Sequence, residues 1–109
     1  MSTPVSDGTQ HSRCMAAATA VLGDKWNPHI IRALEGEPLR FCEIQDAAGG
    51  VNPRTLSGRL SRLEELLIVE KRILSEYPRH TDYRLTEPGR ALLPILDQMA
   101  EWSERFGPA

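Results

Sequence analysis

Three arginines lie in the stretch VNPRTLSGRLSRLEELL, residues 51–67, and no acidic residue precedes Glu64 in it. A guanidinium group can donate two hydrogen bonds to the O6 and N7 atoms of guanine, and serine and threonine hydroxyls can reach bases or phosphates. A glycine removes a side chain at a point where a helix can then lie close to DNA. The stretch therefore indicates DNA contact, through Arg54, Thr55, Ser57, Gly58, Arg59, Ser61 and Arg62.

The charge of the whole chain gives a different indication. The 109 residues carry a formal net charge of -2, whereas dedicated nucleic-acid binders are often basic. Residues 51–84 contain seven Lys or Arg and five Asp or Glu, so this segment carries +2 and the remainder of the chain carries -4. Acidity elsewhere is compatible with one face that is dedicated to a polyanion.

A helix over residues 53–66 is expected to carry these side chains. Asn52 is a good N-cap, and Pro53 fits the first helical position. At about 100° per residue, the apolar side chains form one narrow stripe, which consists of Leu56, Leu60, Leu63 and Leu67. The opposite face holds Arg54, Gly58, Ser61 and Arg62, with Thr55 and Arg59 at its flanks.

Helical periodicity predicts three more helices before this one. The first covers residues 13–22, and the second follows Asp24 as its cap, or begins later if Asn27 is the cap. The third covers residues 41–48 and ends at a Gly-Gly pair. A short helix, a turn with glycine and a second helix have the form of a helix-turn-helix, whose second helix enters the major groove of DNA.

A β-hairpin is expected next. Residues 68–74 alternate, with Val69, Lys71 and Ile73 on one face, and residues 81–86 form a second short strand. Residues 75–80, SEYPRH, contain a proline and predict the turn. A hairpin in this place can act as a wing beside a phosphate backbone or minor groove, and the side chains it would present are Arg79 and His80, with Arg84 or Lys71 as further candidates.

One long helix is expected to close the chain. Thr86 is its cap, the helix runs to Phe106, and Pro94 should kink it. The predicted fold is thus mainly α with a small β-hairpin, in the order of a winged helix-turn-helix. Residues 1–12 are expected to be a disordered tail, and residues 13–109 a single winged helix-turn-helix DNA-binding domain.

Several stretches together resemble the HxlR-type winged-helix transcriptional regulators, which are relatives of the MarR-like repressors. The resemblance extends from Cys14 to Trp102 and is specific in the order and spacing of its parts, which are GDKW at 23–26, RFCEI at 40–44, LSGRLSRLEE at 56–65 and YPRHTDYRLTEPGRALLPIL at 77–96. A glycine is usual in that family where Leu67 stands, so we expect the helix exit to be built differently here. The family often has proline where this chain has Met15.

The resemblance implies a small cytoplasmic regulator that binds double-stranded DNA as a homodimer. Residues 53–66 would be the recognition helix, residues 68–85 the wing, and the N- and C-terminal helices the dimer interface. A two-fold dimer would recognise an imperfect palindrome, with half-sites roughly 10 bp or more apart from centre to centre.

The last helix gives its own indication of a dimer. Its apolar side chains form a stripe that one small domain cannot easily cover, and a partner could bury it. The alternative is that the helix closes the core of its own chain. The interface candidates are Leu92, Ile95, Leu96, Met99 and Trp102, with Phe106 beyond them.

Control of the regulator is predicted from a cysteine. Cys14 lies at an expected helix N-terminus beside Arg13, where partial positive charge can lower the pKa of a thiol. Some members of the family that this chain resembles respond to oxidants or electrophiles through a cysteine in this position. A thiol switch or a small-molecule or electrophile effector is therefore one interpretation, and a small buried apolar residue is the other. Cys42 is expected to have an inert structural role.

Other functions find little support in the residues. The two cysteines and three histidines have no metal-ligand spacing, no cofactor is indicated, and neither a serine–histidine–aspartate order nor a phosphate-cradling glycine loop indicates an enzyme. Arg40 could approach a phosphate too, but a structural ion pair is the role that we expect for it. No apolar run could span a membrane and no signal peptide is apparent, so a reducing cytoplasm is expected. The alternative function is a winged-helix module that binds protein and not DNA.

Overall fold

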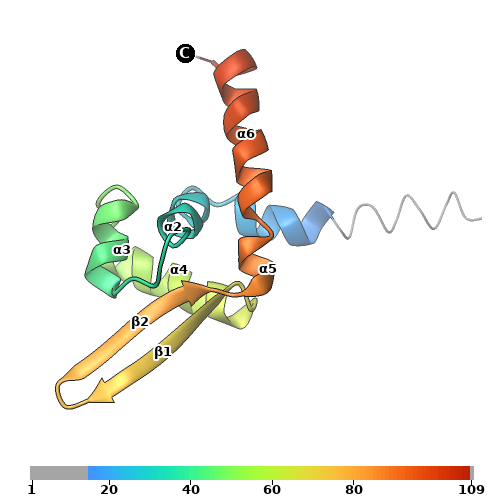
Figure 1. Ribbon diagram of the computed structural model, residues 1–109. Coiled ribbons are helices and arrows are strands. Elements are labelled where there is room, and N and C mark those ends of the chain that lie inside the picture. Colours follow the sequence, from blue (N-terminus) through green and yellow to red (C-terminus); the bar gives the residue numbers. More distant parts are fainter. Residues whose placement is uncertain (1–14, 109) are drawn as a thin grey trace, which may run out of the picture.

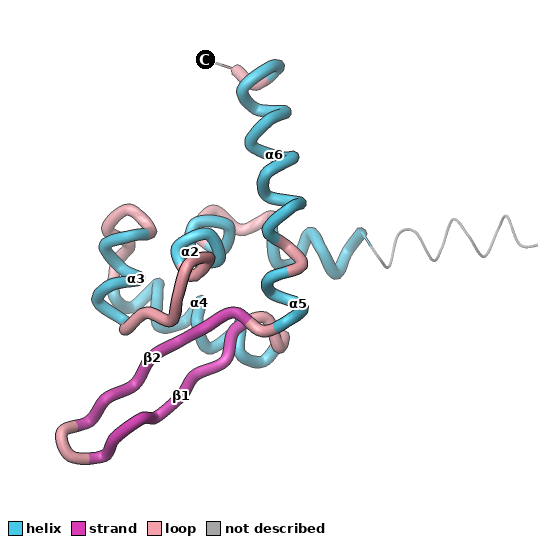
Figure 2. The backbone as a smooth tube through the Cα atoms, viewed as in Figure 1, coloured by secondary structure: helices cyan, strands magenta, loops and turns pink. Residues whose placement is uncertain are grey.

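The computed structural model of the chain describes residues 15–108, and most of them are helical (Figure 1). A helix over residues 15–22 comes first. The elements after it are α2 (Asn27–Ala33), α3 (Phe41–Ala47), α4 (Pro53–Glu65), β1 (Val69–Glu76), β2 (Arg79–Leu85), α5 (Glu87–Arg90) and α6 (Leu93–Phe106). Figure 2 shows that the two strands form one hairpin, which projects to one side, while α6 extends away on the other. The tail predicted over residues 1–12, and Cys14, lie outside the described residues.

The core lies where α2, α3 and α4 meet. Each helix contributes fully buried aliphatic side chains, among them Ile30 and Ile31 from α2, Ile44 from α3, and Leu56 and Leu60 from α4. Burial of each such side chain contributes about 1.5–3 kcal/mol. The apolar face of α4 is therefore fixed inward, and its polar face is fixed outward.

The start of α4 is as predicted. The Oδ1 atom of Asn52 accepts hydrogen bonds from the backbone N–H groups of Arg54 and Thr55, at 2.8 and 3.4 Å. Pro53 takes the first helical position, where a missing N–H leaves no hydrogen bond unmade. Gly49 and Gly50 precede it with φ of 102° and 78°, a conformation that glycine adopts without strain.

The end of α4 differs from the prediction. Leu67 is not part of the buried stripe: it is 69% exposed and has a φ of 62°. The N–H of Ile68 donates to the carbonyl of Leu63, and the N–H of Leu67 donates to that of Glu64, which is the usual glycine-type helix ending. The expectation of a differently built exit is therefore wrong. The chain keeps this turn because it buries Ile68 and leads directly into β1.

The hairpin is longer than predicted. Its strands pair in antiparallel fashion from Val69 opposite Leu85 to Glu76 opposite Arg79, so only two residues form the turn instead of six. The base of the hairpin packs against the helices, since Val69 and Leu85 are buried. The outer half extends beyond them, which leaves Ile73 exposed.

The predicted last helix is broken into two. Thr86 caps α5 as expected, with its hydroxyl accepting the N–H of Gly89 at 3.1 Å, but α5 ends after four residues. Proline has no N–H, and inside a helix its ring clashes with the carbonyl four residues earlier. Pro94 therefore lies in the first turn of a new helix, α6, and the predicted kink is not formed.

The entry to α2 follows neither predicted cap. The N-cap residue is Trp26, which makes no side-chain capping hydrogen bond. Asp24 lies before it, and its Oδ1 accepts the N–H groups of Trp26 and Asn27 at 2.8 and 3.1 Å. Asn27 is the first residue of α2 and is buried, with its amide donating to the carbonyl of Val21 at 2.9 Å. Within residues 15–108, no helix combines the length and apolar character that crossing a lipid bilayer requires.

Candidate nucleic-acid interface

The outward face of α4 is a polar strip with arginine at each end. Arg54 and Arg62 are exposed, and between them lie Ser57, Gly58 and Ser61, which are exposed as well. A methyl group built on Gly58 would meet no atom within 4 Å. The middle of the strip is therefore low and open, so that a flat or convex surface could approach the helix backbone there. Thr55 lies at its edge, half-buried.

Arg59 has a different environment from the other two arginines of α4. Its Nε atom lies 2.8 Å from Oδ2 of Asp24, and both side chains are largely covered, with exposed fractions of 38% and 24%. Its Nε–H is not directed at the carboxylate as a hydrogen bond, so the contact is an ion pair. Arg59 thus connects the middle of α4 to the start of α2.

The pKa of Asp24 reflects these contacts. Burial acts to raise it, but Arg59 and the backbone N–H groups of Trp26 and Asn27 together outweigh burial, so the pKa lies below its ordinary value. Asp24 is therefore held as a carboxylate between two helices. The sequence-based prediction gave Arg59 the same outward role as its neighbours, because the partner lies 35 positions away in the chain.

Arg62 is held more loosely. It pairs with Glu65 one turn later at 3.0 Å, but the two side chains are 61% and 68% exposed. Exposed pairs at this spacing contribute only about 0.3–0.5 kcal/mol. A competing anion could displace Glu65 at little cost.

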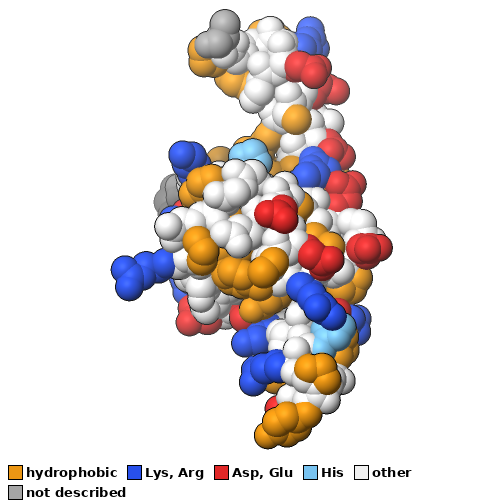
Figure 3. Space-filling view, turned by 90° about the vertical axis from the view of Figure 1, so that its left-hand side faces the viewer, with side chains coloured by type: hydrophobic (Ala, Val, Ile, Leu, Met, Phe, Trp, Pro, Cys, Tyr) orange, Lys and Arg blue, Asp and Glu red, His pale blue; other side chains and the backbone are white. Residues whose placement is uncertain are grey.

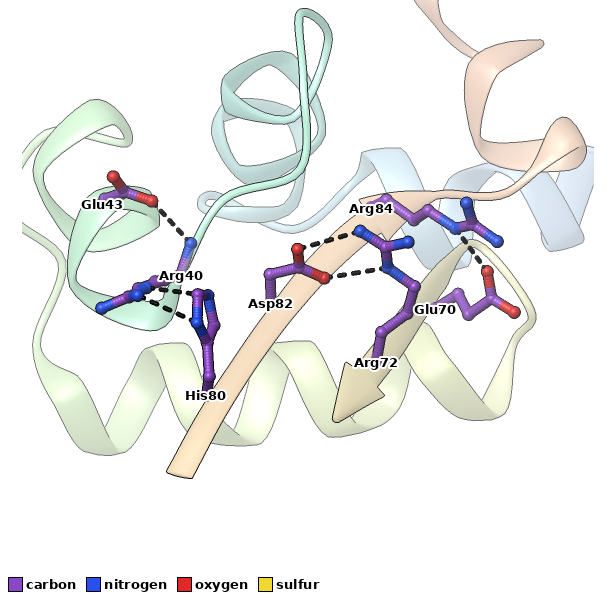
Figure 4. Close-up of polar contacts among 7 residues, drawn as sticks. All are labelled: Arg40, Glu43, Glu70, Arg72, His80, Asp82 and Arg84. Carbon is purple, nitrogen blue, oxygen red and sulfur yellow. Dashed lines mark hydrogen bonds and ion pairs between the residues drawn. The ribbon is translucent and has the colours of Figure 1, made fainter. Parts of the chain in front are cut away.

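Two arginines of the hairpin are paired across its strands. Arg72 donates two hydrogen bonds to Asp82, both at 3.0 Å, and Asp82 raises the pKa of Arg72 (Figure 4). Arg84 lies opposite Glu70 and donates to it at 2.6 Å. These pairs connect the two strands of the hairpin. Arg84, which the sequence offered as a further wing contact to DNA, is thus paired with Glu70.

The hairpin also contacts the start of α3, through Arg40 and His80. The Nε and Nη2 atoms of Arg40 lie 3.2 and 3.1 Å from the two ring nitrogens of His80 (Figure 4). Within residues 15–108, no Asp or Glu lies within ion-pair distance of Arg40, so the structural ion pair predicted for it is not found there. Arg79 is exposed beside His80, and Cys42 is an exposed free thiol and not the structural residue that was predicted.

The arginines therefore fall into two groups. Within residues 15–108, five have a carboxylate partner, namely Arg32, Arg59, Arg62, Arg72 and Arg84. In the same part of the chain, five have no Asp or Glu within ion-pair distance, namely Arg40, Arg54, Arg79, Arg90 and Arg105. Figure 3 shows Lys and Arg side chains gathered on and beside the projecting hairpin, while acidic side chains predominate higher on the molecule.

The apolar stripe predicted on the last helix also divides. Leu96 is buried in the core of its own chain, and Leu92 packs against that core. The other apolar side chains of α6 are exposed, namely Ile95, Met99, Trp102 and Phe106. The rings of Trp102 and Phe106 lie 6.1 Å apart. One end of the stripe thus closes the core of its own chain, as the second alternative predicted, and the other end is uncovered.

A helix-turn-helix formed by α3 and α4, followed directly by a hairpin, defines the class of winged helix-turn-helix proteins. Residues 21–109 match the family described as HxlR-like helix-turn-helix. The chain belongs to this family.

Similar proteins agree with the assignment. The HTH-type transcriptional regulator YodB of Bacillus subtilis is 38% identical over 92 residues, which are 84% of this chain and 82% of YodB. The reduced form of YodB superposes with a TM-score of 0.77 at 35% identity, over 97% of this chain and 95% of that one. Quinone-bound YodB gives 0.74 at 34% identity, over 86% and 99%. A transcriptional regulator of the MarR family from Porphyromonas gingivalis gives 0.76 at 25% identity, over 84% and 90%.

The chain is accordingly a helix-turn-helix transcriptional regulator. The predicted fold class and the resemblance to the HxlR-type family are confirmed. The prediction of a regulator and not an enzyme is confirmed by the family as well.

Proposed function

We propose that the chain binds double-stranded DNA in a sequence-specific manner, with α4 in the major groove and the hairpin as a wing beside the backbone. The observation that carries this proposal is the distribution of arginine partners. Arg54 and Arg79 are exposed and have no carboxylate partner among residues 15–108, and they lie on the two elements that winged-helix proteins direct at DNA.

Each residue of the strip has a role in this proposal. Arg54 lies in the first turn of α4, where recognition helices contact base edges, and it can bind guanine through two hydrogen bonds. Ser57 and Ser61 contact bases or phosphates, and Gly58 permits a close approach. Arg62 and Thr55 contact the backbone at the edges of the groove, as do Arg79 and His80 from the wing. Arg59 positions α4 through Asp24.

The active form in this proposal is a homodimer on a palindromic operator. Ile95, Met99 and Trp102 present an apolar surface on α6, and a two-fold partner would bury it. Leu92 and Leu96 support this surface from beneath by fixing α6 on the core of its own chain. Two copies of α4 would then read inverted half-sites separated by about 10 bp or a multiple of that distance.

The proposed signal is an oxidant or a small electrophile that acts on Cys14. Support comes from YodB, of which a quinone-bound structure is known. Operator binding before and after quinone treatment tests this, with Cys14→Ser expected to lose the response. Cys42→Ser serves as the control and should respond as the wild type does. An unchanged response in Cys14→Ser would contradict the assignment.

The salt dependence of DNA binding tests the central proposal. With about 6–10 phosphate contacts in a dimer, affinity should fall by roughly 10³–10⁵ between about 50 and 200 mM salt. Arg54→Ala should reduce specific binding by about 1–3 kcal/mol and leave random-sequence binding less affected. Arg90→Ala removes an exposed arginine of α5, which lies on neither α4 nor the hairpin, so it controls for lost charge. Binding that is insensitive to salt and to Arg54→Ala would instead favour a protein-interaction module.

A further inference from the structure

A hollow lies where the start of α3 meets the hairpin. Seven residues line it: Arg40, Phe41, Cys42, Glu43, Arg79, His80 and Thr81. Arg40 directly precedes α3, and His80 lies on β2, 40 positions later, with the guanidinium against the imidazole ring (Figure 4). The contact joins the first helix of the helix-turn-helix to the wing.

Hydrogen-bond donors exceed acceptors in this hollow. A guanidinium group has only donors, and a neutral imidazole has one acceptor nitrogen and one N–H. Arg40 approaches both ring nitrogens, at 3.2 and 3.1 Å, so one of the two approaches must face an N–H. Glu43 accepts the backbone N–H of Arg40 through Oε1 at 2.8 Å, and within residues 15–108 its carboxylate forms no ion pair with the guanidinium of Arg40 or Arg79. An anion with several oxygen acceptors would satisfy the surplus donors.

The elements around the hollow indicate which anion it is suited to. In a helix-turn-helix the first helix crosses the DNA backbone while the second enters the groove. Arg40 lies at the start of that first helix, and Arg79 extends from the wing on the other side of the hollow. A phosphate group of the DNA backbone matches both the charge and the place.

We propose that Arg40 and His80, with Arg79 beside them, bind one backbone phosphate of DNA, and that His80 takes up a proton when this phosphate binds. The inference rests on the proposed function and extends it to a particular contact and a pH response.

The link to protons follows from the charges that face His80. The charged groups that surround His80 are Arg40 and Glu43 from the start of α3 and Arg79 from its own strand, with Glu76 opposite Arg79 in the hairpin. A phosphate in the hollow would add negative charge beside the ring and stabilise its charged form. DNA binding should therefore become tighter as the pH falls through about 6.5, where an imidazole ordinarily titrates.

The test measures duplex DNA binding by fluorescence anisotropy at constant ionic strength, at about pH 8 and about pH 5.5. The wild type should bind roughly 3–10-fold more tightly at the lower pH, because one coupled proton contributes at most about tenfold per pH unit. His80→Gln should lose most of this difference. His29→Gln is the matched control, since His29 lies on α2 beside Trp26, and it should keep the difference. Arg40→Gln should weaken binding at both pH values and reduce the salt slope by about 1.

Three results would overturn the inference. One is an equal pH response in wild type and His80→Gln, with both proteins shown to be folded by circular dichroism. Another is an unchanged affinity and salt slope in Arg40→Gln. The third comes from NMR: a His80 ring signal that shifts with inorganic phosphate but not with duplex DNA would assign the hollow to free anions. If the wild type bound no duplex DNA, the proposed function itself would fail, and this inference with it.

Discussion

Gly58 offers a test in which protein stability and DNA binding should change in opposite directions. A glycine inside a helix costs about 0.5–1 kcal/mol relative to alanine. A Cβ at position 58 would meet no atom within 4 Å. Gly58→Ala should therefore raise the free energy of unfolding by about 0.5–1 kcal/mol, and the melting temperature by about 2–8 °C for a domain of this size.

DNA binding should respond in the opposite sense. If α4 lies in the major groove with Gly58 toward the bases, an added methyl group occupies the space of the approach. Neighbouring base contacts, each contributing about 1–3 kcal/mol, would then be weakened, so we expect a loss of about tenfold or more in specific affinity. Thermal unfolding and fluorescence anisotropy on the same protein samples measure the two effects.

Gly89→Ala is the matched control for this experiment. The substitution is chemically identical and also falls in a helix, but a Cβ at position 89 would clash with the carbonyl oxygen of Ile68. Crowding of this kind costs about 1–3 kcal/mol, so the melting temperature should fall. A Gly58→Ala protein that is more stable and binds DNA as the wild type does would refute the close approach, and one that is less stable would refute the open outward face of α4.

Three further predictions concern elements that hold the interface in place. Leu67→Gly should raise stability by about 1 kcal/mol, because leucine at a positive φ costs about 1–2 kcal/mol. The control Glu65→Gly, in the last turn of α4, should lower stability by about 1 kcal/mol. Urea unfolding of both variants distinguishes the two effects. Asp24→Asn should lower stability near neutral pH by about 0.2–1 kcal/mol, because the amide oxygen can still accept the two backbone N–H groups but the ion pair with Arg59 is lost. Folding lowers the pKa of Asp24, so its contribution to stability is present above its ordinary pKa of 3.8 and is lost as the pH falls through the lower folded value. The stabilities of variant and wild type should therefore converge in acid. Stability curves that stay parallel down to about pH 2 would contradict this. Trp102→Asp should convert a dimer into a monomer, as measured by the molar mass in light scattering. Its melting temperature should differ little from those of other variants with substitutions at exposed positions of α6. A molar mass equal to that of the wild type would place the interface elsewhere.

Local signals explain what the sequence predicted well. Asn52 and Pro53 define the start of α4 by chemistry that acts within one turn, and the spacing of Leu56, Leu60 and Leu63 fixes its inward face. These features do not depend on the rest of the chain, so the strip of polar side chains on the opposite face could be predicted as well.

Features that depend on distant residues could not be predicted in the same way. The partner of Arg59 is Asp24, and the partner of Arg84 depends on a strand register that includes a bulge between Ile73 and Ser75. Leu67 is apolar at helical spacing, yet the turn into β1 places it in solvent. The sequence therefore indicated which arginines exist on this surface, and the structure was needed to distinguish those that are paired from those that are free for a ligand.

Selection of bound sequences from a pool of random duplex DNA tests sequence-specific binding by a dimer. We expect enrichment of an inverted repeat whose half-site centres are separated by roughly 10 bp or a multiple of it, and loss of that enrichment in Arg54→Ala. A pool that emerges without any enriched sequence, or the same repeat recovered by wild type and Arg54→Ala alike, would contradict it.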